Sequence, residues 1–187
     1  MSISFSETGF GVSYGRDVVN AESHLPGFNM KNSSEKTNVM RILGQHGIAY
    51  QSYTYSGVIS GADVAAVLKQ DPRQVFKTLV TVGHSKTHYV FVVPVCGELD
   101  LKKAAAAVGE KSIEMIKARE LFPLTGYVHG GCSPVGMKKL FRTVIDQSAG
   151  DFETILFSAG KIGFQVEVAP KDLKQLVPFE LADIAGS

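Results

Sequence analysis

The segment from residue 75 to 82, Val-Phe-Lys-Thr-Leu-Val-Thr-Val, constrains the fold more than any other part of the chain. It is rich in β-branched and aromatic residues and contains no breaker, which predicts a β-strand. Because side chains alternate between the two faces of a strand, both faces are largely apolar and the strand is predicted to be buried. Lys77 lies within it, where an ammonium is costly unless it meets an anion, several acceptors or a wet pocket. Lys77 is therefore the first candidate for a functional residue; the alternative is that its stem lies along the sheet and its head reaches water.

Length and composition are typical of one globular domain. The 187 residues are 44% apolar and 20% charged, which is enough for a sizeable core. No apolar run approaches the ~20 residues that a membrane span needs, and the N-terminus shows no signal-peptide pattern. Two cysteines, Cys96 and Cys132, without a CxxC motif favour a reducing, cytoplasmic location. The five histidines show no metal-ligand spacing, so the sequence predicts no metal site and no cofactor.

Charge is distributed unevenly along a chain whose net charge is only +1. Residues 101–142 contain eight lysines and arginines against three glutamates, whereas the segment that follows, 146–187, is acidic. Such a basic band is typical of a surface that binds a polyanion such as RNA. A solvated surface with chance clustering is the alternative.

The other segments predict a succession of short elements. Residues 1–33, rich in Ser, Gly and Asn, are predicted to be a flexible tail or an added N-terminal extension, with Met30 as an alternative start, and residues 34–187 a single domain. Short strands, hairpin-like links and scattered helices predict an α+β fold with a mostly antiparallel, curved or barrel-like mixed sheet and flanking helices. Ser60 with Asp63 resembles a capping box, and Asp100 and Gly109 are predicted to bound a helix. Helices are predicted over residues 36–46, 60–69, 100–108, 118–122 and 171–176, and strands over 49–55, 75–82, 88–95, 112–116, 126–129, 141–146, 154–158 and 163–168.

Two glycine-containing segments are further candidates for a site. Residues 130–136, Gly-Gly-Cys-Ser-Pro-Val-Gly, have a backbone that a ligand can approach closely, although an ordinary tight turn is the alternative. Their spacing is neither that of a dinucleotide-binding fingerprint nor that of a P-loop. Residues 157–167 predict a strand, a glycine turn and a second strand, with Ser158 and Gln165 flanking the turn, and a plain hairpin is the alternative here.

Several of these segments occur in an order and spacing that resemble one known family. They are Lys-Thr-Asn-Val-Met-Arg-Ile-Leu at 36–43, Val-Phe-Lys-Thr-Leu at 75–79, Leu-Asp-Leu-Lys-Lys at 99–103, Thr-Gly-Tyr-Val-His-Gly-Gly-Cys-Ser-Pro-Val-Gly at 125–136 and Ser-Ala-Gly-Lys-Ile-Gly at 158–163. The chain resembles the YbaK/EbsC family of aminoacyl-tRNA deacylases, which is related to the editing domain of bacterial prolyl-tRNA synthetase, over roughly residues 36–185. The resemblance implies a mixed barrel-like fold and an ester hydrolase or lyase that removes wrongly attached amino acids from tRNA in trans, most typically cysteine from tRNA(Pro).

The resemblance also implies which residues form the site. The family's working lysine corresponds to Lys77, and the expected substrate-binding residues are Tyr55, Gly130, Gly131, Ser158 and Gln165. Typical members have an aspartate where this chain has Gln165, so hydrogen-bonding capacity is kept while the negative charge that would hold the substrate's α-ammonium is lost. Cys132 stands where an aliphatic residue is usual.

The implied chemistry needs no protein nucleophile. An aminoacyl ester needs little activation, so positioning can supply much of the rate, and the resemblance suggests that the thiol of cysteine attacks its own carbonyl. Small steric differences are worth only about 1–3 kcal/mol, so a proline-accepting synthetase cannot firmly exclude a side chain of similar size. The expected partners are aminoacylated tRNA, with tRNA(Pro) first, and prolyl-tRNA synthetase.

Two other functions remain open from the residues. One is a hydrolase with Cys132 as nucleophile and His129 as base, although no third group that would orient the pair is evident. The other is a non-catalytic RNA-binding or protein-binding module on the same fold, which the loss of charge at Gln165 favours. The first predicts that activity depends on Cys132, and the second predicts tRNA binding without release of the amino acid.

Overall fold

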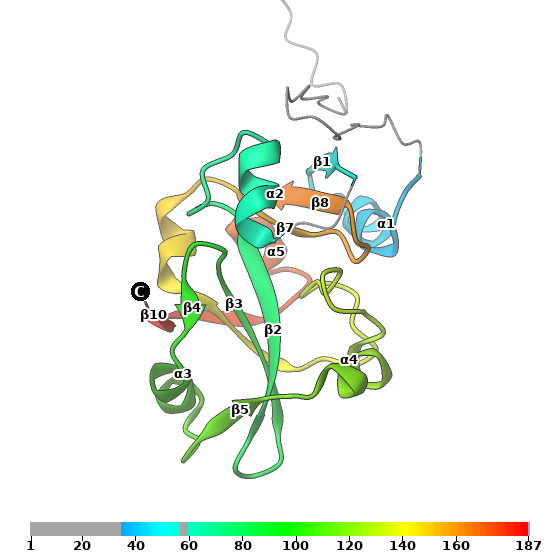
Figure 1. Ribbon diagram of the computed structural model, residues 1–187. Coiled ribbons are helices and arrows are strands. Elements are labelled where there is room, and N and C mark those ends of the chain that lie inside the picture. The colour runs from blue at the N-terminus through cyan, green and yellow to red at the C-terminus, as the bar shows by residue number, and fades with distance from the viewer. Residues whose placement is uncertain (1–34, 57–59, 187) are drawn as a thin grey trace, which may run out of the picture.

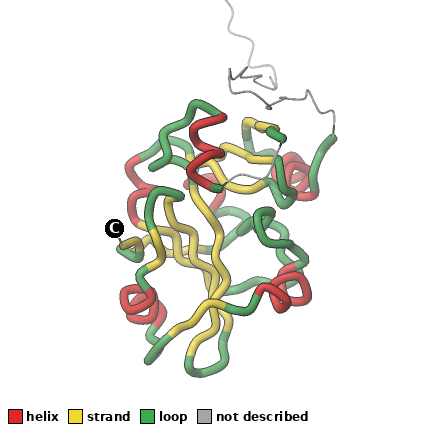
Figure 2. Tube along the Cα trace, in the orientation of Figure 1, coloured by secondary structure: helices red, strands yellow, loops and turns green. Residues whose placement is uncertain are grey.

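The computed structural model describes residues 35–56 and 60–186, in which helices surround a central group of strands (Figures 1 and 2). The predicted tail, residues 1–33, lies outside the described residues, and the predicted single domain over 34–187 stays a prediction. The helices are α1 (Asn38–Gln45), α2 (Gly61–Val67), α3 (Leu101–Val108), α4 (Ala118–Thr125) and α5 (Pro170–Leu173), with a 3-10 helix over Gln147–Asp151. The strands are β1 (Gln51–Thr54), β2 (Phe76–Gly83), β3 (His88–Pro94), β4 (Glu98–Leu99), β5 (Ile113–Met115), β6 (Arg142–Asp146), β7 (Ile155–Ser158), β8 (Phe164–Val168), β9 (Phe179–Ala182) and β10 (Ala185–Gly186). None of the described helices has the length and apolarity that crossing a bilayer requires.

The described strands form three sheets, so the predicted α+β class is correct and the curved or barrel-like sheet is not. A five-stranded mixed sheet has the order β5-β2-β3-β6-β9, with antiparallel pairs on one side of β3 and parallel pairs on the other. A three-stranded antiparallel sheet has the order β1-β8-β7, and β10 pairs with β4. None of these sheets closes on itself. The sequence suggested that the strands would join one barrel, but they pair in three separate groups.

Strand β2 packs against apolar clusters on both faces, as the apolar residues on each of its faces predict, although four of its eight residues are only partly buried. Phe76 and Val80 pack in the largest core cluster, together with β3, β7, β8 and α1. Leu79, on the other face, packs against a second cluster that contains α3 and the opposite face of β3. Val75, just before the strand, belongs to a third cluster with α2 and Leu156.

Local signals set the helix ends that the sequence indicated. Ser60 accepts from the backbone of Asp63, and the Asp63 carboxylate accepts from the Ser60 amide at 3.0 Å, so the predicted capping box is confirmed. Asp100 caps α3, and Gly109 ends it in the left-handed conformation with a φ of 75°.

Four local predictions are wrong or incomplete. Helix α4 continues through Pro123 to Thr125, because in a helix this short the missing proline N–H removes only one hydrogen bond. The strand predicted over residues 126–129 is absent: Gly126 closes α4 with a φ of 83°, and the Thr125 hydroxyl accepts from the Tyr127 amide, so the backbone turns. The 3-10 helix was not predicted, and the end of the chain is not irregular, because it forms β9 and β10.

Candidate functional site

Lys77 and Ser158 are brought to the same side of the molecule by a contact between the two larger sheets. Val75 and Leu156 form a parallel bridge, and Lys77 and Ser158 each follow two residues later. Because side chains alternate along an extended backbone, both point toward the side on which Val75 and Leu156 pack, the side covered by α2. The lysine of β2 and the serine at the end of β7 therefore share one side of neighbouring strands.

Gln165 and Tyr55 complete this group. Gln165 lies directly opposite Ser158 in the β7–β8 pair, and its amide nitrogen is 3.5 Å from the hydroxyl oxygen of Tyr55. The Gln165 side chain is buried, yet its amide oxygen has no hydrogen-bond partner among the described residues. Buried polar atoms normally have partners, so this oxygen is an acceptor available to a bound group. We call Tyr55, Lys77, Ser158 and Gln165 the candidate site.

The glycine loop, residues 130–136, contacts the turn that joins β7 to β8. Gly130 has a φ of +80°, a conformation that side chains rarely adopt, and the position of a Cβ on Gly131 would be only 3.2 Å from the amide nitrogen of Ile162. The same turn accepts a hydrogen bond from the amide of Tyr55 at the carbonyl of Gly163, 2.9 Å away. The exposed backbone at Gly130 thus lies against the turn that Ser158 and Gln165 flank.

Lys77 is neither fully buried nor free in solvent. Val75 packs in the third cluster and Leu79 against the second, so Lys77 lies at the boundary between two apolar clusters. Its side chain is 27% exposed, and its Nζ lies 2.8 Å from Oε1 of Glu98, whose side chain is 82% exposed. The ammonium therefore has an anionic partner, as the cost of burial requires, and the partner is a residue that the sequence did not single out.

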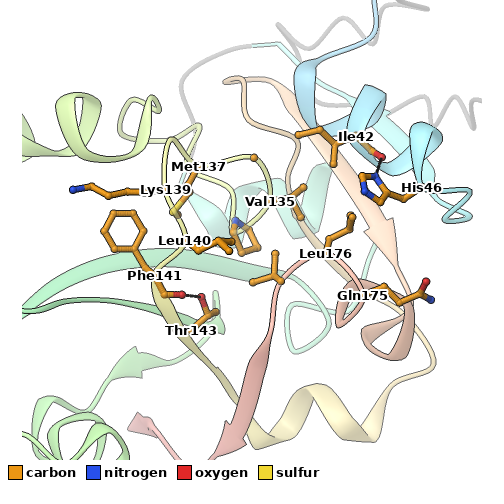
Figure 3. Close-up of a pocket in the computed structure, with 13 residues that line it drawn as sticks. Ile42, His46, Val135, Met137, Lys139, Leu140, Phe141, Thr143, Gln175 and Leu176 are labelled. Atoms are coloured by element: carbon orange, nitrogen blue, oxygen red, sulfur yellow. Dashed lines mark hydrogen bonds between the residues drawn. The ribbon is translucent and has the colours of Figure 1, made fainter.

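A separate hollow lies on the other side of the glycine loop (Figure 3). Its volume is about 240 Å³, and it lies between α1, the end of the glycine loop and the segment after α5. The lining is mainly apolar, the His46 ring nitrogen is 3.0 Å from the carbonyl of Ile42, and Lys139 extends away from the other labelled side chains in Figure 3. None of the four candidate-site residues lines it. Among the described residues no cluster of three His, Cys, Asp or Glu side chains could hold a metal ion.

The basic band is partly neutralised by the acidic C-terminal segment. Lys103 pairs with Asp183 at 2.8 Å and Arg142 with Glu180 at 3.2 Å, so two of its cations meet acids from residues 146–187. Lys138 and Lys139 lie instead over aromatic rings, Lys138 at 4.9 Å from the Phe122 centroid. The charge asymmetry along the sequence is therefore smaller on the folded surface than it is along the chain.

Comparison with known proteins decides which family this arrangement belongs to. The family described as "Aminoacyl-tRNA editing domain" matches residues 57–176, more than half of the chain. The chain belongs to this aminoacyl-tRNA editing family. Lys77, Gly130, Gly131, Ser158 and Gln165 lie within the matched residues, and Tyr55 lies two residues before them. By this homology the protein is an aminoacyl-tRNA deacylase, which confirms the resemblance that the sequence motifs indicated.

Similarity to individual proteins agrees with this family assignment and with the fold. A protein of Enterococcus faecalis, EbsC, named as a candidate Cys-tRNA(Pro)/Cys-tRNA(Cys) deacylase, is 42% identical over 157 residues, which cover 82% of this chain and 96% of the relative. A crystal structure described as a candidate trans-editing enzyme for prolyl-tRNA synthetase superposes with a TM-score of 0.72 at 24% identity, covering 82% of this chain and all of the other. The hypothetical protein APE2540 gives a TM-score of 0.71 at 22% identity, covering 79% and 99%. At these identities the two structures support the fold alone.

The alternative of a cysteine nucleophile is disfavoured by burial. Burial raises the pKa of the Cys132 thiol to about 12, so the thiol is protonated at neutral pH, whereas a nucleophilic cysteine needs a lowered pKa. Cys132 packs in the largest core cluster, and His129 is exposed. The position of Cys132 is thus that of a core side chain.

Cys132→Ala is therefore expected to keep the deacylation rate per folded enzyme within about two-fold of the parent, while lowering the free energy of unfolding by about 1–2 kcal/mol through lost packing. Single-turnover deacylation and urea denaturation measure the two quantities. Loss of activity by more than about 100-fold in a variant that remains folded would instead establish Cys132 as the nucleophile.

Proposed function

We propose that the protein hydrolyses mischarged aminoacyl-tRNA in trans, with Cys-tRNA(Pro) as its main substrate. The observation that supports this most directly is that Gln165, opposite Ser158, approaches Tyr55 on the side of β7 and β8 that Lys77 shares on neighbouring β2. The name of the enterococcal relative, 42% identical, supports cysteine as the amino acid that is removed. Prolyl-tRNA synthetase is the proposed partner that delivers the substrate, and the experiment below tests this interaction as well.

The groups of the site have complementary roles in the proposal. Lys77 binds a phosphate or ribose oxygen at the 3′ end of the tRNA, or stabilises the negative charge that grows on the ester oxygen. The amide oxygen of Gln165 accepts from a donor of the aminoacyl group, since it has no partner among the described residues. The exposed backbone of Gly130 orients the same group, and Gly131, which is buried against the turn between β7 and β8, holds Gly130 beside that turn.

The chemistry is supplied by the substrate itself. The sulfur of the cysteinyl group attacks its own carbonyl carbon, a C–S bond forms, the ester C–O bond breaks, and the ribose oxygen takes up the proton that the thiol gives up. Water then opens the cyclic thioester to give free cysteine. The protein's own contribution is then orientation of the ester by the glycine loop and stabilisation of charge by Lys77.

A panel of charged tRNAs tests the proposal. We expect Cys-tRNA(Pro) to be deacylated at least about ten-fold faster than Ala-, Ser-, Thr- and Pro-tRNA(Pro), because none of these carries a thiol. Cys-tRNA(Cys) shows whether the free protein selects the tRNA, and addition of prolyl-tRNA synthetase shows whether presentation changes that selection. Release of alanine or serine faster than cysteine would contradict the substrate assignment. Binding of every tRNA without release of any amino acid would favour the non-catalytic binding module. That alternative is suggested by Gln165, which lacks the negative charge of the aspartate in typical members.

A further inference from the structure

Glu98 forms an ion pair with the ammonium of Lys77. Among the described residues, the side chain of Lys77 makes one hydrogen bond, the 2.8 Å contact between its Nζ and Glu98 Oε1. The Lys77 side chain is mostly covered and the Glu98 side chain is mostly exposed, at 27% and 82%. A group that approaches from solvent can therefore reach the carboxylate and the ammonium it holds.

The backbone of Glu98 is held by hydrogen bonds to neighbouring elements and does not belong to a free loop. After β3 the chain turns through a hydrogen bond from Gly97 N to Pro94 O, and Glu98 then pairs with Gly186 of β10. Strand β10 is anchored in turn by the buried carboxylate of Asp146, whose Oδ2 accepts from the amide of Ala185 at 2.9 Å. Glu98 is thus held opposite Lys77 by the C-terminal strand.

An ammonium that is paired with a carboxylate is not available to a phosphate. Exposed ion pairs are weak, so a phosphodiester or a developing oxyanion can displace Glu98 from Lys77, but it must compete with it. We propose that Glu98 is a positioning residue for Lys77: it orients the ammonium in the empty enzyme and competes with the 3′ end of the tRNA for it. This inference rests on the proposed function. Such competition weakens binding of the substrate and, equally, binding of the deacylated tRNA. In a protein that acts in trans, weaker binding of the product helps it to leave.

Glu98→Gln tests the role because it keeps the size of the side chain and removes its charge. We expect the KM for Cys-tRNA(Pro) and the Kd for uncharged tRNA(Pro) to fall about two- to five-fold, the worth of an exposed ion pair, with kcat within about two-fold of the parent. Glu180→Gln is the matched control, since Glu180 is an exposed glutamate paired with Arg142 at 3.2 Å. It removes the same charge and is expected to leave KM and Kd unchanged.

The same measurements in the Lys77→Ala background separate positioning from a general charge effect. If Glu98 acts through Lys77, adding Glu98→Gln to Lys77→Ala leaves the Kd for uncharged tRNA(Pro) unchanged. Equal tightening of binding in both backgrounds, or by Glu180→Gln as well, would overturn the inference. An unchanged or raised KM and Kd in the single variant would overturn it too. Because Kd is measured with uncharged tRNA, it still reports on Glu98 if the parent protein releases no amino acid, the result that would refute the proposed function.

Discussion

Lys77→Ala lowers kcat/KM for Cys-tRNA(Pro) by about 100-fold or more, the largest effect that we expect from a single substitution. Removal of one preorganised electrostatic group from an acyl-transfer site typically costs two to three orders of magnitude in rate. The lysine lies at the boundary between two core clusters and its side chain is 27% exposed, so truncation leaves no large cavity. The measurement is single-turnover deacylation at subsaturating enzyme, where the rate is proportional to kcat/KM, with the melting temperature recorded alongside.

Lys86→Ala is the matched control for this experiment. Lys86 is exposed in the turn of the same hairpin, at the opposite end of β2 from Lys77, and it lies outside the candidate site. It removes the same charge and is expected to keep the parental rate. A Lys77→Ala protein that clears Cys-tRNA(Pro) at the parental rate would remove Lys77 from the mechanism, and with it the proposed role of the ammonium.

Asp146→Asn is expected to lower the free energy of unfolding by about 3 kcal/mol at pH 7, the largest effect on stability. The buried Asp146 carboxylate accepts from the amide and hydroxyl of Ser148 at 3.0 and 2.6 Å, and from the amides of Ile184 and Ala185 at 3.1 and 2.9 Å. An asparagine replaces one acceptor oxygen by a donor that would face these N–H groups and removes the charge that strengthens the remaining bonds. Urea denaturation of the parent and the variant measures the difference. An exposed aspartate of the neighbouring 3-10 helix provides the control: Asp151→Asn is expected to change stability by less than about 0.5 kcal/mol.

The effect of Asp146→Asn depends on pH in a defined direction. Burial alone raises the pKa of Asp146, but the hydrogen bonds from Ser148, Ile184 and Ala185 outweigh it and hold the pKa below its ordinary value of 3.8. A carboxyl whose pKa is lower in the folded state stabilises the protein fully above the unfolded pKa, and this stabilisation is lost as the pH falls through the folded pKa. The difference between parent and variant therefore shrinks below about pH 4. A difference that stayed constant or grew on acidification would contradict this account of the site.

Part of the fold could be predicted from the sequence because it depends on neighbouring residues. The capping box of Ser60 and Asp63 and the helix end at Gly109 each depend on contacts within about one turn. The β2–β3 hairpin likewise joins segments separated by a short turn. The wrong predictions arose where a local signal was outweighed, as at Pro123, or where an element is too short to give a local signal, as in the two-residue strand β10.

The candidate site was predictable only as a set of motifs. Lys77 could be singled out because a lysine in an apolar strand needs an explanation, and the glycine loop because its composition is unusual. Glu98 carried no such signal, since an exposed glutamate between short elements is ordinary in a sequence. Its role became visible only from the contact with Lys77, which β4 and β10 place there.

The sequence by itself determined the buried strand with its lysine, the helix caps and the motifs that identify the family, because each is written in contiguous residues. Only the tertiary structure decided that the strands separate into three sheets, that Gln165 meets Tyr55 from 110 positions away, and that Glu98 holds Lys77. Such contacts depend on which distant strands pair. Strand pairing depends on how the whole chain buries its apolar side chains, so the hydrophobic pattern of any single segment does not predict it.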